Sequence, residues 1–378
     1  GDGGVDISPI ADLMKSDVRN IAIEMGYKLM RMSYSSIIRE SEDFGAALTD
    51  IKGNQLAESV QSTPLQSGPI PGYVKNIIEV FKKRRIKFNE GDVIMHNDPY
   101  GGASHGPDIA LIVPVFFKKK LIGFSGTTAH HLDIGALSPG SCGIVDAIDV
   151  YAEGLQFKAI KVYDGGKRNN AVWQILIDNV RAPNMVVGDM EAQVAACQIG
   201  AERFIDLVKK YGLKAVNDAS KALMDYSEKL MRDAIKEVPD GIYSATTFLD
   251  GFLEDPYKKD LPLVVTITIS GEEIIVDLEG TAPQVDDRPI NMPLIGTVDI
   301  SIWLTVRSVL LDSDIFGYIP QNSGLTRPIT IKVPKGCLAN PIFPAPVIAR
   351  FTPGNQLADT VMKALAQAVP KQVSAGIG

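Results

Sequence analysis

The spacing of apolar residues predicts helices in four stretches of the chain. Between residues 8 and 38 apolar side chains recur at steps of three and four, which indicates one long helix or two broken ones. The clearest helical region runs over residues 191–236, where Tyr211-Gly212 separates two apolar stripes, and we expect these two helices to pack as a hairpin. Shorter helices are expected over residues 73–83 and 355–369.

Apolar runs and alternating patterns predict strands elsewhere. These strands are expected over residues 44–57 (two strands around a turn), 92–95, 109–117, 121–128, 263–269, 273–278 and within 315–350. The runs 109–117 and 121–128 are apolar at both alternations, which is typical of strands covered on both faces. Ser270-Gly271 lies between the runs 263–269 and 273–278 and indicates that these two strands form a hairpin.

These elements predict an α+β fold with mixed, mainly antiparallel sheets, a helical hairpin and flanking helices. A chain of 378 residues exceeds what one hydrophobic core usually serves. We expect four regions: N-terminal helices with a small β segment (1–90), a β region with long Gly-rich loops (91–190), the helical hairpin (191–240), and a β-rich region with a final helix (241–378).

Composition excludes several classes of protein. Apolar residues make up 45% and charged residues 22%, which is ordinary for globular proteins and argues against intrinsic disorder. A net charge of −7 gives no general attraction to nucleic acid or to anionic lipid. The three cysteines form no CxxC pair and no apolar run is long enough for a membrane helix, so we expect a cytoplasmic protein.

The candidate chemistry is concentrated in one part of the chain. All four histidines fall between positions 96 and 131, among three aspartates: His96, Asp98, His105, Asp108, His130, His131 and Asp133. Imidazole and carboxylate together suit a divalent metal such as zinc, manganese or iron. The alternative is a set of hydrogen-bonded histidines in a polar loop.

Three of these residues are placed where they could meet. His105 and Asp108 flank a Gly-Pro turn just before one buried strand, and His130 ends the next. If the two strands form an antiparallel hairpin, the three side chains reach one edge of the sheet. Two imidazoles and one carboxylate would leave coordination positions open, as catalytic metal sites require.

Other catalytic arrangements have weaker signals. There is no GxSxG motif, and Cys142 in a Gly-rich turn is a weak candidate nucleophile. No GxxxxGK[ST] motif occurs, so any ATP would be bound by another chain.

At these residues the sequence resembles the hydantoinase B/oxoprolinase family. The segments that carry the resemblance are 39–44 (RESEDF), 97–108 (NDPYGGASHGPD), 129–141 (AHHLDIGALSPGS), 151–154 (YAEG), 179–183 (NVRAP) with Gly188-Asp189, 277–285 (DLEGTAPQV) with 289–291 (PIN), 319–329 (IPQNSGLTRPI) and 340–346 (NPIFPAP). They follow one another in order over nearly the whole chain. One departure is Gly135-Ala136, where the family usually has two glycines.

The resemblance implies a protein that works beside a hydantoinase A-type subunit, which uses ATP to phosphorylate a carbonyl or enol oxygen. It also implies a divalent metal held at the positions of His105, Asp108 and His130. The family divides into ATP-dependent hydrolases of cyclic amides and ATP-dependent ketone carboxylases, so a hetero-oligomer and a cyclic amide or ketone substrate are expected. Family chains usually extend further, which predicts that the family sequence continues beyond residue 378.

The expected mechanism is attack of a metal-activated water on a phosphate-activated amide carbon. His131, Asp133 or Glu153 would relay protons or orient a ligand. A carboxylase would use the same cation to steady an enolate. A third hypothesis is a metal-stabilised structural subunit without chemistry of its own.

Overall fold

The computed structural model describes residues 9–34, 44–58, 70–101, 108–131, 154–249, 261–286, 290–311, 323–347 and 351–369. The chain divides into two compact units, each with its own sheet. The first comprises Gly1–Ile144, Tyr151–Met224 and Pro320–Ser323, and the second comprises Val145–Val150, Asp225–Ile319 and Gly324–Gly378. The expected division into four regions stays a prediction. In the described ranges no helix is long and apolar enough to cross a membrane.

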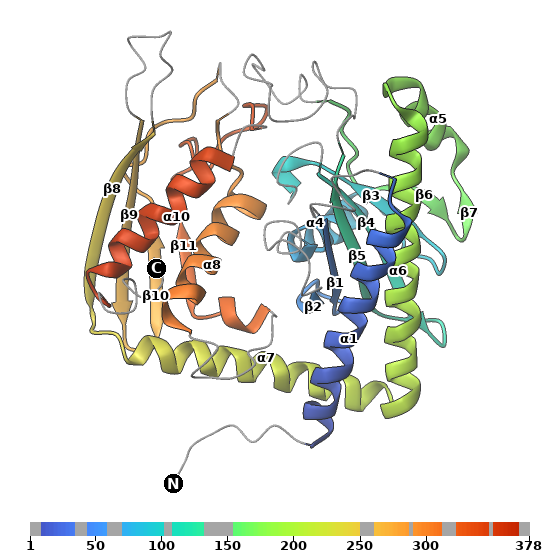
Figure 1. Cartoon of the computed structure of the whole chain (residues 1–378), viewed down its shortest axis with the longest axis horizontal. Coiled ribbons are helices and arrows are strands. Elements are labelled where there is room, and N and C mark those ends of the chain that lie inside the picture. The colour runs from blue at the N-terminus through green and yellow to red at the C-terminus, as the bar shows by residue number, and fades with distance from the viewer. Residues whose placement is uncertain are drawn as a thin grey trace. The chain divides into compact units, whose positions relative to one another are not determined.

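The first unit is built on a seven-stranded sheet in which every neighbouring pair is antiparallel (Figure 1). The strand order is β2-β1-β5-β4-β3-β6-β7. The strands are β1 (Phe44–Thr49), β2 (Gln55–Glu58), β3 (Val93–His96), β4 (Asp108–Phe117), β5 (Lys120–His130), β6 (Ile160–Asp164) and β7 (Lys167–Arg168). The first five confirm the predicted strands of this region, whereas β6 and β7 lie in a stretch that carried no strand prediction.

Helices cover both faces of this sheet, as the continuous apolar runs predicted. Three helices pack on one face: α1 (Pro9–Met32), α5 (Asn170–Asn179) and α6 (Pro183–Tyr211). Helix α4 (Ile70–Arg84) packs on the other face, where Ile77 and Phe81 meet Ile112 and Phe124. Strands β4 and β5 are therefore enclosed at the centre of the unit.

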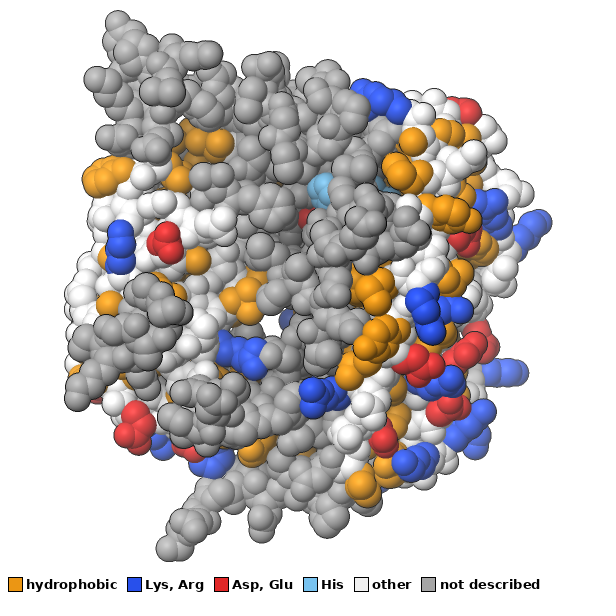
Figure 2. Space-filling model, in the orientation of Figure 1, with side chains coloured by type: hydrophobic (Ala, Val, Ile, Leu, Met, Phe, Trp, Pro, Cys, Tyr) orange, Lys and Arg blue, Asp and Glu red, His pale blue; other side chains and the backbone are white. Residues whose placement is uncertain are grey.

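Helix α6 lies unusually close to its neighbours at Gly200. A Cβ atom at this position would lie 2.4 Å from Ser125 Oγ and 2.6 Å from Met25 Sδ. The absence of a side chain therefore allows α6 to approach β5 and α1 together. On the outer side of this helical layer, charged side chains of both signs alternate with apolar ones (Figure 2), and Arg203 pairs with Glu24 across the two helices.

The long helical region divides at Gly212, as predicted. Gly212 has φ 86°, a left-handed conformation that favours glycine, and it separates α6 from α7 (Leu213–Lys236). The predicted packed hairpin needs correction, because α6 packs along α1 and over β4 and β5 rather than along α7. The apolar face of α6 is covered by α1 and by the sheet, with which it shares two core clusters.

The second unit has a four-stranded sheet of order β11-β10-β9-β8. Its strands are β8 (Gly241–Leu249), β9 (Leu261–Ser270), β10 (Glu273–Asp277) and β11 (Ile329–Lys332). The β9–β10 hairpin around Ser270-Gly271 is confirmed, while β11 pairs with β10 in parallel, so the sheet is mixed. The expected strands within 315–350 reduce to β11 in the described residues. Two helices, α8 (Asp299–Leu310) and α10 (Phe351–Ala366), pack on one face and close the core.

Short helical turns connect these elements. They are the 3-10 turns η1 (Pro99–Gly101) and η4 (Ser323–Thr326), and the turn η3 (Leu294–Val298), which has a kink at Ile295 and Gly296.

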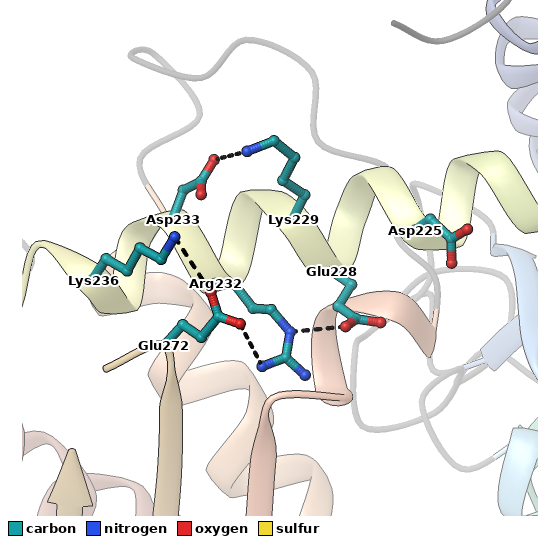
Figure 3. A pocket seen from close by; sticks show the side chains of 7 residues that line it. All are labelled: Asp225, Glu228, Lys229, Arg232, Asp233, Lys236 and Glu272. Carbon is teal, nitrogen blue, oxygen red and sulfur yellow. Dashed lines mark hydrogen bonds and ion pairs between the residues drawn. The ribbon is translucent and has the colours of Figure 1, made fainter. Parts of the chain in front are cut away.

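An ion-pair network fixes the second half of α7 to the second unit. Seven residues line a pocket of about 230 Å³: Asp225, Glu228, Lys229, Arg232, Asp233, Lys236 and Glu272. Figure 3 shows Arg232 between Glu228 and Glu272. Arg232 Nε lies 2.8 Å from Glu228 Oε2, and Arg232 Nη1 lies 3.5 Å from Glu272 Oε1. Arg327 bonds Asp225 and Glu228 from the side of β11. The acidic and basic side chains that line this pocket pair with one another. The pocket is therefore explained by ion pairs that hold α7 to the rest of the second unit.

Candidate functional site

A buried carboxylate and a buried imidazole meet at one end of the β4–β5 hairpin. The two strands pair antiparallel with Asp108 directly opposite His130. His130 Nδ1 lies 3.1 Å from Asp108 Oδ1, and the residues are 6% and 1% exposed. The sequence predicted this juxtaposition because the first residue of one strand faces the last residue of the next.

His96 lies on the same face of the sheet. It is paired with Ala110 in the β3–β4 register, two positions from Asp108 on β4, and its ring meets Tyr73 of α4 edge-on. The backbone N–H of Ala159 donates to His96 Nδ1 at 3.1 Å, which places the proton of a neutral ring on Nε2. His96 therefore belongs to the polar part of the face that carries Asp108 and His130.

His131 points toward α6 rather than toward α4. Its Nε2–H donates to Gln193 Oε1 at 2.8 Å, and Gln193 lies on α6. Burial lowers the pKa of His131 below its ordinary value and outweighs the opposing effect of the Gln193 bond. At neutral pH His131 is therefore a neutral imidazole with a fixed tautomer.

A row of polar side chains on α6, which the sequence pattern did not reveal, continues from this contact. Asp189, Gln193 and Cys197 recur every four residues and are all buried. Gln193 Nε2 donates to the Ile109 carbonyl at 2.9 Å, and Asp189 accepts the N–H of Tyr34 at 2.5 Å. The signal in the sequence was this four-residue spacing within an otherwise apolar helix face.

The remaining predicted site residues lie outside the described residues: His105, Asp133, Glu153 and the alternative nucleophile Cys142. Among the described side chains no group of three or more His, Cys, Asp or Glu residues could hold a metal. The described part of the chain thus brings together two of the three proposed metal ligands.

The geometry of these two residues fits a divalent cation with nitrogen and oxygen ligands. Two atoms each about 2.1 Å from one cation, at roughly 90–110° to each other, lie about 3.0–3.4 Å apart. The observed Nδ1–Oδ1 distance of 3.1 Å falls in that interval. Burial of both groups in the sheet end also keeps the donors in a fixed geometry.

The chain matches the hydantoinase B/oxoprolinase family over residues 9–378. It belongs to this family. A protein proposed to be the B-type subunit of a D-/L-hydantoinase, from Pseudomonas sp. strain NS671, is 66% identical over 375 residues, which is 98% of this chain and 63% of that protein. The beta chain of the caprolactamase of Pseudomonas jessenii is 32% identical over 359 residues, covering 94% of this chain and 59% of that protein. The chain thus spans somewhat less than two thirds of these relatives.

Two solved structures have the same fold. The crystal structure of the ATP-dependent caprolactamase from Pseudomonas jessenii superimposes with a TM-score of 0.85 at 30% identity, over 96% of this chain and 60% of that chain. A nucleotide-free acetone carboxylase structure also has a TM-score of 0.85, but at 18% identity, over 95% of this chain and 48% of that chain. The second likeness concerns the fold alone.

Proposed function

We propose that this family member is the metal-holding part of the B-type subunit of an ATP-dependent hydrolase of cyclic amides. In this proposal an A-type partner uses ATP to phosphorylate the substrate, and the present chain hydrolyses the activated amide. The observation that carries the proposal is the buried Asp108–His130 pair at the end of the hairpin. The similarity to a hydantoinase component and to an ATP-dependent caprolactamase supports the choice of a cyclic amide as substrate.

The proposed ligands of the cation are His105, Asp108 and His130. Zinc, manganese and iron all accept two imidazoles and a carboxylate. When bound, such an ion acts as a Lewis acid and lowers the pKa of a coordinated water molecule toward neutrality. The residues of this chain contribute a buried, preorganised pair of donors at the sheet end.

Two arrangements are compatible with the 3.1 Å contact. In the first, Nδ1 of His130 and Oδ1 of Asp108 both bind the cation. In the second, Asp108 accepts the Nδ1–H of His130 and orients the ring so that Nε2 binds. Substituting Asp108→Asn and titrating metal separates them: loss of an orienting partner weakens binding about 10–100-fold, and loss of a ligand weakens it further.

His131, Asp133 and Glu153 are proposed to relay protons or to orient a ligand. For His131 the bond to Gln193 favours the orienting role, because it anchors the chain at the residue next to His130. The neutral ring also retains an unprotonated nitrogen, Nδ1, that could accept a proton. Asp133 and Glu153 enter this proposal through the sequence resemblance.

A ketone carboxylase is the second candidate. It shares the expected metal ligands, and the acetone carboxylase structure supports a common fold. We rank it second, because the more similar relatives at 66% and 32% identity are named for cyclic-amide hydrolysis. A non-catalytic structural subunit is the third candidate.

The test is to purify the chain with its A-type partner and to offer ATP with a hydantoin, a lactam, or a ketone plus bicarbonate. We expect ATP consumption coupled to ring opening of a cyclic amide, and coupling to a ketone instead would support the carboxylase. In the Asp108→Ala variant we expect assembly without turnover. Loss of assembly in that variant would favour the structural alternative. ATP turnover by this chain alone would contradict the assigned role of the partner.

A further inference from the structure

Strand β8 forms one edge of the sheet in the second unit. It pairs with β9 over its whole length, from Gly241 opposite Ile269 to Leu249 opposite Leu261, without a bulge or a change of register. Its other side has no neighbouring strand among the described residues. An edge of nine paired residues is long, because edge strands are commonly short or interrupted.

The sequence of β8 carries none of the usual protection of an edge. It reads GIYSATTFL, with no charged residue and no proline. The other three edge strands in the described ranges differ: β2 and β11 have four residues each, and β7 has two residues, both cationic. Since exposed edges without charge, proline or bulge readily accept another strand, β8 is the edge most suited to pairing.

At alternate residues of β8 the backbone N–H and C=O groups point away from β9, toward the open edge of the sheet. The carbonyl of Ser244 accepts a hydrogen bond from the exposed side chain of Gln367, so it is directed off the sheet. Residues two apart on a strand share this direction, which includes Ile242 and Phe248. Their side chains are 73% and 56% exposed, so apolar surface accompanies the free backbone groups.

We propose that β8 pairs antiparallel with β8 of a second copy of this chain, which would join two four-stranded sheets into one. A two-fold axis at Ala245 places Ile242 of one copy opposite Phe248 of the other, and Ser244 opposite Thr246. Aliphatic–aromatic and hydroxyl–hydroxyl pairs are favourable neighbours across antiparallel strands. Within the nine residues of β8 no like charges oppose each other, because the strand has no charged residue. A closed two-fold interface also leaves no further edge of this kind exposed.

The interface is expected to be weak, because one strand pair buries less than the roughly 1,200 Å² of standard interfaces. We therefore expect a monomer–dimer equilibrium in the micromolar range. The Gln367 side chain must leave the Ser244 carbonyl when the strands pair. This exchange replaces one hydrogen bond by another.

Sedimentation velocity of the chain over a concentration series tests the proposal. We expect dimers to form with increasing concentration, and the Thr246→Lys substitution to raise the dissociation constant at least tenfold, because the two ammonium groups would lie diagonally across the seam, within reach of each other's repulsion. The matched control is Thr330→Lys, which places the same charge on the exposed opposite edge strand β11 and should leave the dissociation constant unchanged. Circular dichroism confirms that both variants fold.

Hydrogen exchange on the wild-type chain provides a second measurement that needs no variant. The amides of Ser244 and Thr246 should exchange more slowly at high than at low concentration. A monomer at all concentrations, or a dimer equally sensitive to both substitutions, would overturn the proposal. Protection of β8 only after addition of the A-type partner would also overturn it, and would assign the edge to that partner.

Discussion

Gln193 joins three parts of the candidate site through one side chain. It accepts a hydrogen bond from His131 and donates one to the carbonyl of Ile109, while its backbone belongs to α6. All of these groups are buried, so none of them can exchange its partner for water. The contribution of Gln193 to stability therefore equals the cost of leaving its buried partners, the His131 ring and the Ile109 carbonyl, without a hydrogen bond.

Replacing Gln193 by leucine should lower the free energy of unfolding by about 1–3 kcal/mol, the cost of leaving buried polar groups unsatisfied. Urea denaturation measures this change. The control is Gln174→Leu, because Gln174 is exposed on α5 and bonds only Asp178 in the described residues. We expect the control to change stability by less than about 0.5 kcal/mol. Equal effects in both variants would contradict the role assigned to Gln193.

Cys197 should be unreactive in the folded chain. Burial raises the pKa of its thiol to about 12, so the reactive thiolate is scarce at neutral pH. We expect iodoacetamide to label Cys197 only after unfolding, with no increase between pH 7 and 9, as followed by peptide mass spectrometry. Because the folded pKa is raised, the contribution of this group to stability is complete below about pH 8.5 and declines as pH rises toward 12. Rapid labelling of Cys197 under native conditions would contradict its buried position.

At the residue scale, the sequence revealed site residues that cluster along the chain. It did not reveal those whose role depends on a contact with a distant segment. Asp108 and His130 were found because histidines and aspartates are rare and gathered in a short part of the chain. Gln193 was not found, because the four-residue spacing of Asp189, Gln193 and Cys197 does not show which buried groups these side chains contact until the opposing strand is known. The direction of His131 also depends on which helix covers which face of the sheet.

At the scale of elements, the β4–β5 hairpin positions the site. Continuous apolar runs predicted two enclosed strands, and the short lysine-rich turn left an antiparallel pairing as the simple connection. No element was predicted where the local pattern was weak. β7 consists of only two residues, both polar, and α5 and α8 lie in stretches for which no helix was predicted. The hairpin of α6 and α7 was wrong in its packing, because periodicity indicates an apolar face and not the surface that covers it.

The contact at Gly200 provides a test of how α6 packs. Substituting Gly200→Ala should destabilise the chain by about 1–3 kcal/mol, because the added methyl group would overlap Ser125 and Met25. The matched control is Gly354→Ala on α10, where the added atom would have only ordinary contacts, the nearest at 3.8 Å. We expect the control to be neutral or slightly stabilising, since alanine favours helix. Thermal unfolding of both variants shows whether the two glycines differ as the packing requires.

At the scale of the whole molecule, the chain consists of two compact units, and the second is stabilised in part by ion pairs along α7. The ion-pair network of α7 contributes to the second unit by linking the helix to the β9–β10 turn and to Arg327. Burial alone would raise the pKa of Glu228, but hydrogen bonds from Arg232 and Arg327 outweigh it and lower that pKa. The charged form of Glu228 is therefore stabilised by folding.

Replacing Glu228 by glutamine should lower the free energy of unfolding by about 0.5–1 kcal/mol at pH 7, as is usual for partly exposed ion pairs. Because the folded pKa is lowered, this contribution is present above the unfolded value near 4.3 and is lost as pH falls through the folded value. The deficit should therefore shrink as the pH falls below about 4.3 and vanish once the pH lies below the folded pKa. Glu237→Gln, at an exposed position of the chain just after α7, is the control. A deficit that persists at low pH would contradict an electrostatic origin.

The relatives of this chain are longer than the chain itself, which covers 63% of the hydantoinase component and 59% of the caprolactamase component. Fold class and family could be predicted from sequence because motifs are spread along the whole chain in order. The substrate could not, because a substrate pocket is formed by side chains that are separated in sequence and carry no common pattern.

Metal analysis of the purified chain tests the central claim most directly. Inductively coupled plasma mass spectrometry should find about one divalent cation per wild-type chain, and much less in Asp108→Ala and His130→Ala. The control Asp218→Ala, which removes an exposed carboxylate of α7, should keep the wild-type content. A wild-type chain that binds no divalent metal, or variants at Asp108 and His130 that retain it fully, would contradict the proposed site.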